Sequence, residues 1–518
     1  MKLYTWQQEC LKAWEGNGCR GIAHVATGAG KTVLALEAMR RFRTKYPDGR
    51  VRIVVPTIPL AQQWQFALLQ EAEREEDRPG FFGAGRRDEW DRPLMIYIIN
   101  SARYHLAGHM EQAFALGQPV FLICDECHHY QSRENRRIFH FRIPPFYPEE
   151  QYACLGLSAT PFGTPHDEVL ITGLGKEIFR YGFSEASADG IVSPFTVIET
   201  AATFLPEERK RYQELSYELT ILWAKLLKQY PWLKGMEEKA FQIELNRLAQ
   251  EAGMDPANPA VSFLIKTWER KAVSNLALTR IQCALAILSC LPAKTRAILF
   301  CERISQAKDM LALLRRRMGN IGVLYHSEMT REARTRGLQA FRENQARILI
   351  SCRALDEGID VPDAGVGIVL SSSSVSRQRI QRLGRVLRKA PGKTAACLYY
   401  IYLPESTDDR VYLAGLKNIP CIQLRYNAED GNFSNELYEY AAREVLDKAK
   451  DLNPAQKQEL RKCLLEGLPR ADYLLDPEEL RGGGTETIHE ANYRKTMRKM
   501  SFLFHQDEKG EELKHAEL

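Results

Sequence analysis

A glycine-rich segment near the N-terminus, ATGAGKT at residues 26–32, has the residue types of a phosphate-binding loop. Gly28 and Gly30 would let successive backbone N–H groups point at phosphate oxygens, and the N-terminus of a following helix would add partial positive charge. Lys31 would reach the β- and γ-phosphates, Thr32 would ligate Mg²⁺, and Thr27 would line the same loop. The alternative is a glycine-rich turn with a surface lysine, which a preceding strand and a following helix disfavour. The segment therefore predicts a site for ATP and Mg²⁺.

An apolar run at 121–124 ends in two adjacent carboxylates, Asp125 and Glu126. Asp125 would hold Mg²⁺, directly or through water, and Glu126 would orient and activate an attacking water. An isolated Asp-Glu pair is usually only the polar end of a strand. The catalytic interpretation therefore depends on the phosphate loop that precedes it in the chain.

Four possible zinc ligands overlap these carboxylates: Cys124, Cys127, His128 and His129. Side chains alternate between the two faces of a strand, so these four would not converge without a sharp bend. No second ligand pair follows at the spacing typical of zinc sites. We therefore favour the catalytic interpretation over a structural metal.

The second half of the chain supplies arginines that could complete a phosphate site. Residues 377–389 read RQRIQRLGRVLRK, and Arg385 and Arg388 lie at i and i+3 on one helical face. Two guanidinium groups on one face suit a single γ-phosphate, and such a finger arginine contributes roughly 10³–10⁵ in rate. The alternative is a solvated basic helix. Supplied by a separate domain, these arginines would make hydrolysis depend on closure of a cleft.

Short apolar runs that would position these residues alternate with amphipathic helical stretches. The runs lie at 21–25, 51–56, 94–100, 120–124 and 153–157, and again at 297–301, 321–325, 348–351, 366–370 and 395–402. This alternation is typical of βαβ units around a parallel sheet. We predict an α/β domain at 1–204, a helical insert at 205–290, a second α/β domain at 291–432, and a helical extension with a charged tail at 433–518.

Composition sets broad limits on the class of protein. The 518 residues are 45% hydrophobic and 26% charged, with a net charge of +5, which suits a folded protein and permits a nucleic-acid partner without requiring one. The 12 cysteines form no disulfide framework, which favours a reducing compartment. No signal peptide or membrane span is expected, so we predict a cytoplasmic protein with no membrane partner.

Taken in order, these segments resemble the motifs of superfamily 2 helicases, most closely the XPB-like branch with its DExHH box. The matching segments are ATGAGKT, IVVPTIPLAQQW (53–64), DECHH, SATP (158–161), AILFCERISQA (297–307), RALDEGIDVP (353–362) and QRLGRVLR (381–388). The resemblance covers roughly residues 3–403. It implies two RecA-like domains that hydrolyse ATP in the cleft between them, and movement along a strand in the 3′-to-5′ direction.

The resemblance also implies roles for further residues. Gln7 resembles the glutamine that reads adenine, and Asp360 and Gln381 resemble other nucleotide contacts. Residues expected to couple the nucleotide site to nucleic acid are His128, Ser158, Thr160, Asp356 and Gly358. Residues expected to contact the strand backbone are Pro56, Thr57, Asn100, Ser101 and Cys352; the last stands where the family commonly has threonine.

Regions outside the seven motifs leave alternatives open. The insert carries Tyr212, Tyr217, Trp223, Trp232 and Trp268, which at helical spacing are more often core than a surface that stacks on bases. Residues 433–518 could dock a protein partner such as a nuclease, or form a packed terminal helix. The main hypothesis is a helicase or translocase that acts on DNA rather than RNA. The alternatives are a motor subunit of a restriction or phage-defence complex, and a nucleotide-dependent binding switch with little turnover.

Overall fold

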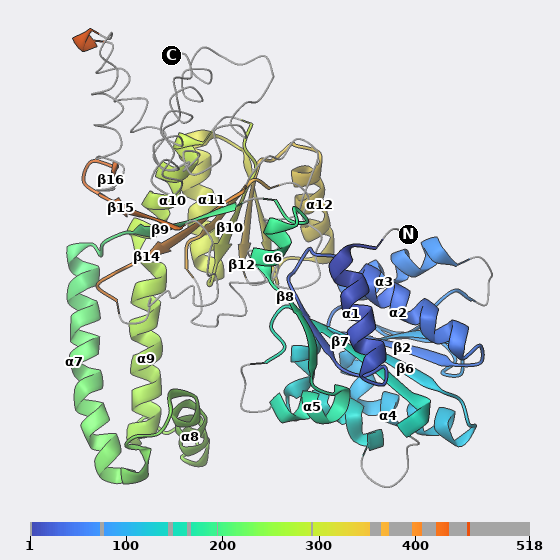
Figure 1. Ribbon diagram of the computed structural model, residues 1–518. Helices are drawn as coiled ribbons and strands as arrows, with labels where there is room; N and C mark the ends of the chain where they lie inside the picture. The colour runs from blue at the N-terminus through green and yellow to red at the C-terminus, as the bar shows by residue number, and fades with distance from the viewer. Residues whose placement is uncertain are drawn as a thin grey trace, which may run out of the picture. The chain divides into compact units, whose positions relative to one another are not determined.

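The computed structural model describes residues 3–72, 77–142, 149–162, 167–193, 195–291, 294–352, 364–371, 396–406, 421–434 and 453–455. Among them, the residues up to Ser193 form one compact unit and the later residues form a second. Each unit is built on its own eight-stranded sheet (Figure 1).

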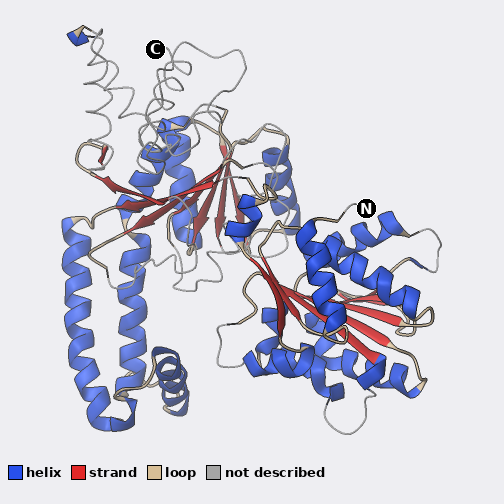
Figure 2. Ribbon diagram, viewed as in Figure 1, coloured by secondary structure: helices blue, strands red, loops and turns tan. Residues whose placement is uncertain are grey.

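The first unit is a parallel sheet with helices on both faces (Figure 2). Its strand order is β4-β3-β5-β2-β6-β7-β1-β8, and only β4 runs antiparallel to its neighbour. The strands are β1 (Ile22–Val25), β2 (Arg50–Val55), β3 (Gly80–Gly83), β4 (Arg86–Arg87), β5 (Leu94–Ile98), β6 (Val120–Asp125), β7 (Tyr152–Ser158) and β8 (Glu177–Tyr181). Strands β5, β6 and β7 are buried throughout, and β2 is buried except at Arg50, as expected for a sheet covered on both faces.

Helices α1 (Thr5–Gly16), α2 (Lys31–Lys45) and α3 (Ile58–Glu71) cover one face of this sheet. Helices α4 (Ile99–Ala115) and α5 (Asp167–Leu174) cover the other, together with the 3₁₀ segments η2 (Cys127–Gln131) and η3 (Asn135–Arg142). The short η4 (Glu149–Gln151) precedes β7, and α6 (Phe183–Ala188) follows β8. The helices that begin directly after strands, α2, α3 and α4, place their N-termini at one edge of the sheet.

The second unit repeats this architecture with strand order β11-β12-β10-β13-β14-β9-β15-β16. Its strands are β9 (Phe195–Ala201), β10 (Ala297–Cys301), β11 (Gly322–His326), β12 (Ile348–Cys352), β13 (Val366–Val369), β14 (Ala396–Tyr402), β15 (Cys421–Tyr426) and β16 (Phe433–Ser434). Helices α10 (Leu278–Cys290), α11 (Ile304–Met318) and α12 (Arg331–Arg342) accompany the sheet. The fold is therefore α/β with two tandem RecA-like domains, as the sequence predicts.

Two expected domain boundaries differ from the structure. Strand β9 pairs in parallel with both β14 and β15, so residues 195–201 belong to the second sheet and not to a first domain that extends to 204. Helix α10 buries Ile281, Ala284 and Leu288 in the core of the second sheet, so it is part of that domain rather than of the insert. In both cases, strand pairing or burial shows which domain the segment belongs to, and the local sequence pattern does not.

The helical insert has a small core of its own. Helices α7 (Pro206–Gln229), α8 (Glu238–Glu251) and α9 (Pro259–Leu276), with η5 (Pro231–Leu233), bury a cluster of leucines and alanines that includes Leu226, Leu245 and Leu264. A loop at 252–258 joins α8 to α9. By length and composition, Pro259–Cys290 could cross a membrane, but it is interrupted at Ala277 and 61% of its apolar window is buried inside the protein.

The aromatic residues of the insert are only partly core. Tyr212 is buried, whereas Trp223 is 36% exposed and packs against Phe241 and Phe263 with ring centroids 5.2 and 5.8 Å apart. Trp232 and Trp268 are each 53% exposed, and Tyr217 is exposed as well. The core interpretation is therefore wrong for these three, because helical spacing does not reveal which face of a two-helix hairpin stays uncovered.

Candidate active site

The predicted residues of the first unit gather at the carboxyl edge of its parallel strands. The loop 26–30 follows β1, Pro56 and Thr57 follow β2, Asn100 and Ser101 follow β5, Glu126 follows β6, and Ala159 follows β7. Parallel strands end at the same edge of a sheet, and ligands of such folds bind there. The topology therefore brings together five segments that are far apart in the sequence.

The phosphate loop depends on two glycines in the left-handed region. Gly28 has φ 85° and Gly30 has φ 101°, a conformation that costs a residue with a side chain more than glycine. A Cβ at Gly30 would also lie 3.0 Å from Gln7 Nε2. Helix α2 begins at Lys31, so its unpaired N–H groups face the loop. Loop and helix together have the geometry of an anion site, the kind of site that the sequence predicts here.

Gln7 of α1 stabilises this loop by a hydrogen bond. Its Nε2 donates a hydrogen bond to the Gly30 carbonyl at 3.0 Å, and its Oε1 accepts one from the Tyr4 N–H at 2.9 Å. The side chain is completely buried. Recognition of adenine by Gln7 stays a prediction, and the geometry adds a second role as a brace of the phosphate loop.

Lys31 meets the two carboxylates. Its Nζ donates a hydrogen bond to Glu126 Oε1 at 3.0 Å. Glu126 has φ 45° and ψ 52°, a left-handed backbone that costs a non-glycine residue about 1–3 kcal/mol and is found mostly at functional sites. Burial and the neighbouring charge of Glu126 raise the pKa of Asp125, against the opposing effect of Lys31. The arrangement places a cation beside two carboxylates at the mouth of the phosphate loop.

His128 lies between Glu126 and the end of β7. His128 Nδ1 lies 2.9 Å from Ser158 Oγ, which accepts a hydrogen bond from the Thr160 N–H at 3.0 Å. His128 Nδ1 also lies 3.5 Å from Glu126 Oε2. Three of the five residues predicted to couple the nucleotide site to nucleic acid, His128, Ser158 and Thr160, are thus connected through Ser158.

The structure also adds residues that the sequence did not single out. Trp64 Nε1 donates a hydrogen bond to Asp125 Oδ2, and Tyr130 Oη lies 2.7 Å from the Asp125 carbonyl. His24 Nε2 lies 2.9 Å from the Ala159 carbonyl and its Nδ1 lies 3.1 Å from Glu177. Each lies within or beside a recognised motif, but the sequence carries no sign of these contacts, because they join separate strands.

The remaining predicted residues are placed as follows. Thr57 precedes α3 and its buried Oγ1 has no hydrogen-bond partner within the described ranges, while Asn100 is exposed and Ser101 half-buried in the first turn of α4. Cys352 is buried at the end of β12 in the second unit. Six predicted residues lie outside the described residues: Asp356, Gly358, Asp360, Gln381, Arg385 and Arg388.

The polar atoms around the loop fit a bound nucleotide with Mg²⁺. Thr27 Oγ1 and Glu126 Oε2 are buried and make no hydrogen bond to any described residue. Asp125 and Thr32 offer the hard oxygen ligands that Mg²⁺ prefers. The zinc alternative finds no support, since no group of three metal-binding side chains occurs among the described residues. Burial also raises the pKa of the Cys124 and Cys127 thiols, which disfavours the thiolate that zinc binds.

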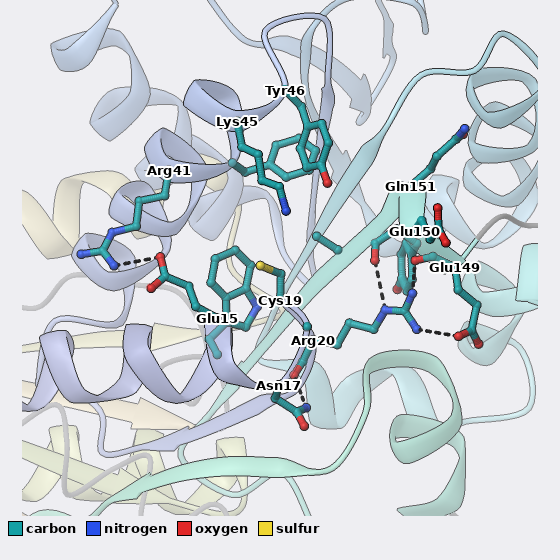
Figure 3. Close-up of a pocket in the computed structure, with 15 residues that line it drawn as sticks. Glu15, Asn17, Cys19, Arg20, Arg41, Lys45, Tyr46, Glu149, Glu150 and Gln151 are labelled. Atoms are coloured by element: carbon teal, nitrogen blue, oxygen red, sulfur yellow. Dashed lines mark hydrogen bonds and ion pairs between the residues drawn. The ribbon is translucent and has the colours of Figure 1, made fainter.

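A cavity of about 630 Å³ lies at the opposite edge of the same sheet (Figure 3). It is lined by the α1–β1 loop, the second half of α2 and the start of β7. Two ion pairs lie within its wall: Arg41 with Glu15 at 3.0 Å, and Arg20 with Glu149 at 3.8 Å. Because these charges already compensate one another and the phosphate loop is remote, we do not assign the chemistry to this cavity.

Comparison with known proteins agrees with this geometry. Residues 1–163 match the family described as "Type III restriction enzyme, res subunit", and residues 279–390 match the helicase conserved C-terminal domain. The DNA 3′-5′ translocase XPB2 of Sulfurisphaera tokodaii is 28% identical over 75% of this chain and 79% of its own. The DNA 3′-5′ helicase XPB of Kineococcus radiotolerans is 24% identical over 80% of this chain and 61% of its own.

Among solved structures, the ATP-dependent Type ISP restriction-modification enzyme LlaBIII bound to DNA aligns over 97% of this chain and 32% of its own, with a TM-score of 0.50 and 15% identity. That likeness concerns the fold alone. The two family matches occur in chain order and each falls on one of the two α/β domains. The chain therefore carries a segment similar to the restriction-enzyme res subunit and a helicase C-terminal segment, and it is similar to superfamily 2 helicases of the XPB-like branch.

Proposed function

We propose that this protein hydrolyses ATP to move along or open DNA. The observation that carries the proposal is the contact of Lys31 with Glu126 at the mouth of a glycine loop, beside the buried carboxylate of Asp125. A γ-phosphate held by Lys31 would lie next to the carboxylate that must orient the attacking water. The names of the XPB-like relatives support DNA as the track and 3′-to-5′ as the direction.

In this mechanism, the backbone N–H groups of the loop and Lys31 bind the phosphates, and Glu126 accepts the proton of the attacking water. Thr32 and Asp125 would hold Mg²⁺, which when bound neutralises phosphate charge and polarises the transferred group. Arg385 and Arg388 are proposed to stabilise the transition-state charge. We propose that His128, Ser158 and Thr160 couple changes at Glu126 during hydrolysis to the end of β7.

The deciding experiment is ATP hydrolysis by the purified chain, alone and with single-stranded DNA, duplex DNA or RNA. We expect strong stimulation by DNA, and an Arg385→Ala variant that keeps ATP affinity but loses roughly 10³-fold or more of the stimulated rate. Stimulation by RNA alone would overturn the choice of track. ATP binding without turnover under any condition would indicate a binding switch instead.

A second candidate is the motor subunit of a restriction or phage-defence complex. The match of residues 1–163 to a restriction-enzyme subunit family favours it. In that case the chain alone would translocate without separating strands, and a nuclease partner would bind through residues 433–518. Co-purification of a nuclease that is lost when residues 433–518 are removed would support this candidate over the first.

A further inference from the structure

Trp64 lies two turns into α3 and is buried, with 1% of its surface exposed. Its indole Nε1 donates a hydrogen bond to Asp125 Oδ2 at 2.8 Å. An indole N–H can only donate, so it favours the ionised carboxylate as its partner. The other oxygen, Oδ1, accepts the Glu126 N–H at 3.0 Å. Two donors from different elements therefore fix the plane of this carboxylate.

A second buried side chain connects the same two segments. Tyr130 Oη lies 2.8 Å from the Val54 carbonyl and 2.7 Å from the Asp125 carbonyl. Strands β2 and β6 are adjacent, with Val54 opposite Cys124. The Pro56–Thr57 loop joins β2 to α3. Hydrogen bonds therefore connect the chain to Asp125 on both sides of this loop: through Tyr130 at Val54 before it, and through Trp64 after it.

We propose that Trp64 is a positioning residue that fixes the Asp125 carboxylate for Mg²⁺ and links it to the Pro56–Thr57 loop through α3. This inference rests on the proposed function, in which Asp125 binds Mg²⁺ and the Pro56–Thr57 loop contacts nucleic acid. If a nucleic-acid strand bound at Pro56 and Thr57 displaced α3, the hydrogen bond from Trp64 to Asp125 would change. The orientation of the Asp125 carboxylate would then change as well. The link is mechanical and runs within one domain.

The chain offers a matched control for this contact. Trp14 is equally buried, at 1% exposure, and its Nε1 donates to the Cys154 carbonyl at 2.8 Å. Trp64→Phe and Trp14→Phe therefore remove the same buried N–H and a similar volume, and only the first removes a donor to Asp125. The measured quantity is the affinity of a fluorescent ATP analogue, titrated at increasing Mg²⁺ and in EDTA.

We expect Trp64→Phe to shift the Mg²⁺ midpoint of nucleotide binding upward by about 10–100-fold, the effect typical of losing a residue that orients a metal ligand. Binding in EDTA should be unchanged, and Trp14→Phe should keep the wild-type midpoint. Equal midpoints in the two variants would overturn the inference. Tyr130→Phe provides a second variant if Trp64→Phe does not fold; an unchanged midpoint there would also count against the link.

Failure of the proposed function would look different. If the wild-type protein bound the nucleotide analogue with no dependence on Mg²⁺, the nucleotide site itself would be wrongly assigned. If the wild type showed that dependence and Trp64→Phe matched Trp14→Phe, only the positioning role would fall. A DNA-stimulated ATPase rate measured on the same samples tests the link to the loop, since Trp64→Phe should lower the stimulation more than the basal rate.

Discussion

Lys31 Nζ and Glu126 Oε1 lie 3.0 Å apart, joining the first turn of α2 to the end of β6 across 95 residues of sequence. Both side chains are mostly buried, with 10% and 15% exposed, so the pair is poorly screened by solvent. The ion pair fixes both side chains beside the phosphate loop. Loss of one partner therefore affects both position and charge of the other.

Glu126→Gln should separate chemistry from binding. The amide keeps the size of the side chain but cannot take the proton of the attacking water, so we expect the ATPase rate to fall by about 10²–10⁴-fold with nucleotide affinity retained. Lys31→Ala should weaken nucleotide binding itself. Steady-state hydrolysis and equilibrium binding on both variants measure the difference, and a near-normal rate in folded Glu126→Gln would remove Glu126 from the mechanism.

Gln7→Ala should destabilise the phosphate loop. The substitution removes the hydrogen bonds to Tyr4 and Gly30 from a buried position, which costs about 1–3 kcal/mol when the partners stay unsatisfied. We expect a lower melting temperature together with a higher KM for ATP. Gln8→Ala, at an exposed neighbouring position, is the control. A raised KM with an unchanged melting temperature would mean that Gln7 contacts the nucleotide without bracing the loop.

The aromatic residues of the insert should divide into two groups. Trp268→Ala should change the free energy of unfolding by about 0.5 kcal/mol or less, because the side chain is 53% exposed. Trp223→Ala should cost about 1–3 kcal/mol, because it removes ring contacts with Phe241 and Phe263. Urea denaturation measures both values, and equal losses would show that the ring contacts of Trp223 do not stabilise the insert. If Trp268 stacks on unpaired bases, its loss should instead weaken binding to DNA.

His109 should make the first unit sensitive to mild acid. Burial, followed by the positive charges of Arg52 and His105, lowers the pKa of His109 to about 4 from an ordinary value of 6.5. Between these values the unfolded chain binds more protons than the folded one, so the free energy of unfolding falls as pH falls from 6.5 toward 4. In His109→Gln that decline should be shallower. Denaturation at several pH values checks this, and parallel curves for both proteins would contradict it.

Much of the first domain follows from local sequence. The apolar runs at 120–124 and 297–301 became β6 and β10 with at most one residue of difference, because buried parallel strands are continuous apolar segments. Strand β8 (Glu177–Tyr181) was missed, since it is only partly buried at the edge of its sheet and its short apolar run is interrupted by charged residues. Strand β9 was not predicted as a strand, and its residues were placed in the first domain, because pairing partners cannot be read from a single segment.

The site shows the same division. Glycines, Lys31, Asp125 and Glu126 could be predicted because their chemistry needs those residue types in that order. Trp64 and Tyr130 could not, because their role depends on distances across strands, and a buried aromatic residue at helical spacing looks like any other part of a core. The contact of Gln7 with Gly30 was missed for the same reason.

The place of β9 has a consequence for synthesis of the chain on the ribosome. Phe195 pairs with Ala396, and Cys421 pairs with Val197, so β9 waits for partners made about 200 residues later. Such distant pairing slows folding, because a long loop must close before any contact compensates for the lost entropy. Both edges of β9 are unpaired until residue 402 has emerged, and one edge stays unpaired until residue 426 has emerged, so β9 needs shielding from other chains. Nascent protein should therefore bind chaperones during synthesis of the insert, and a fragment cut at residue 204 should aggregate where one cut at 193 stays dispersed.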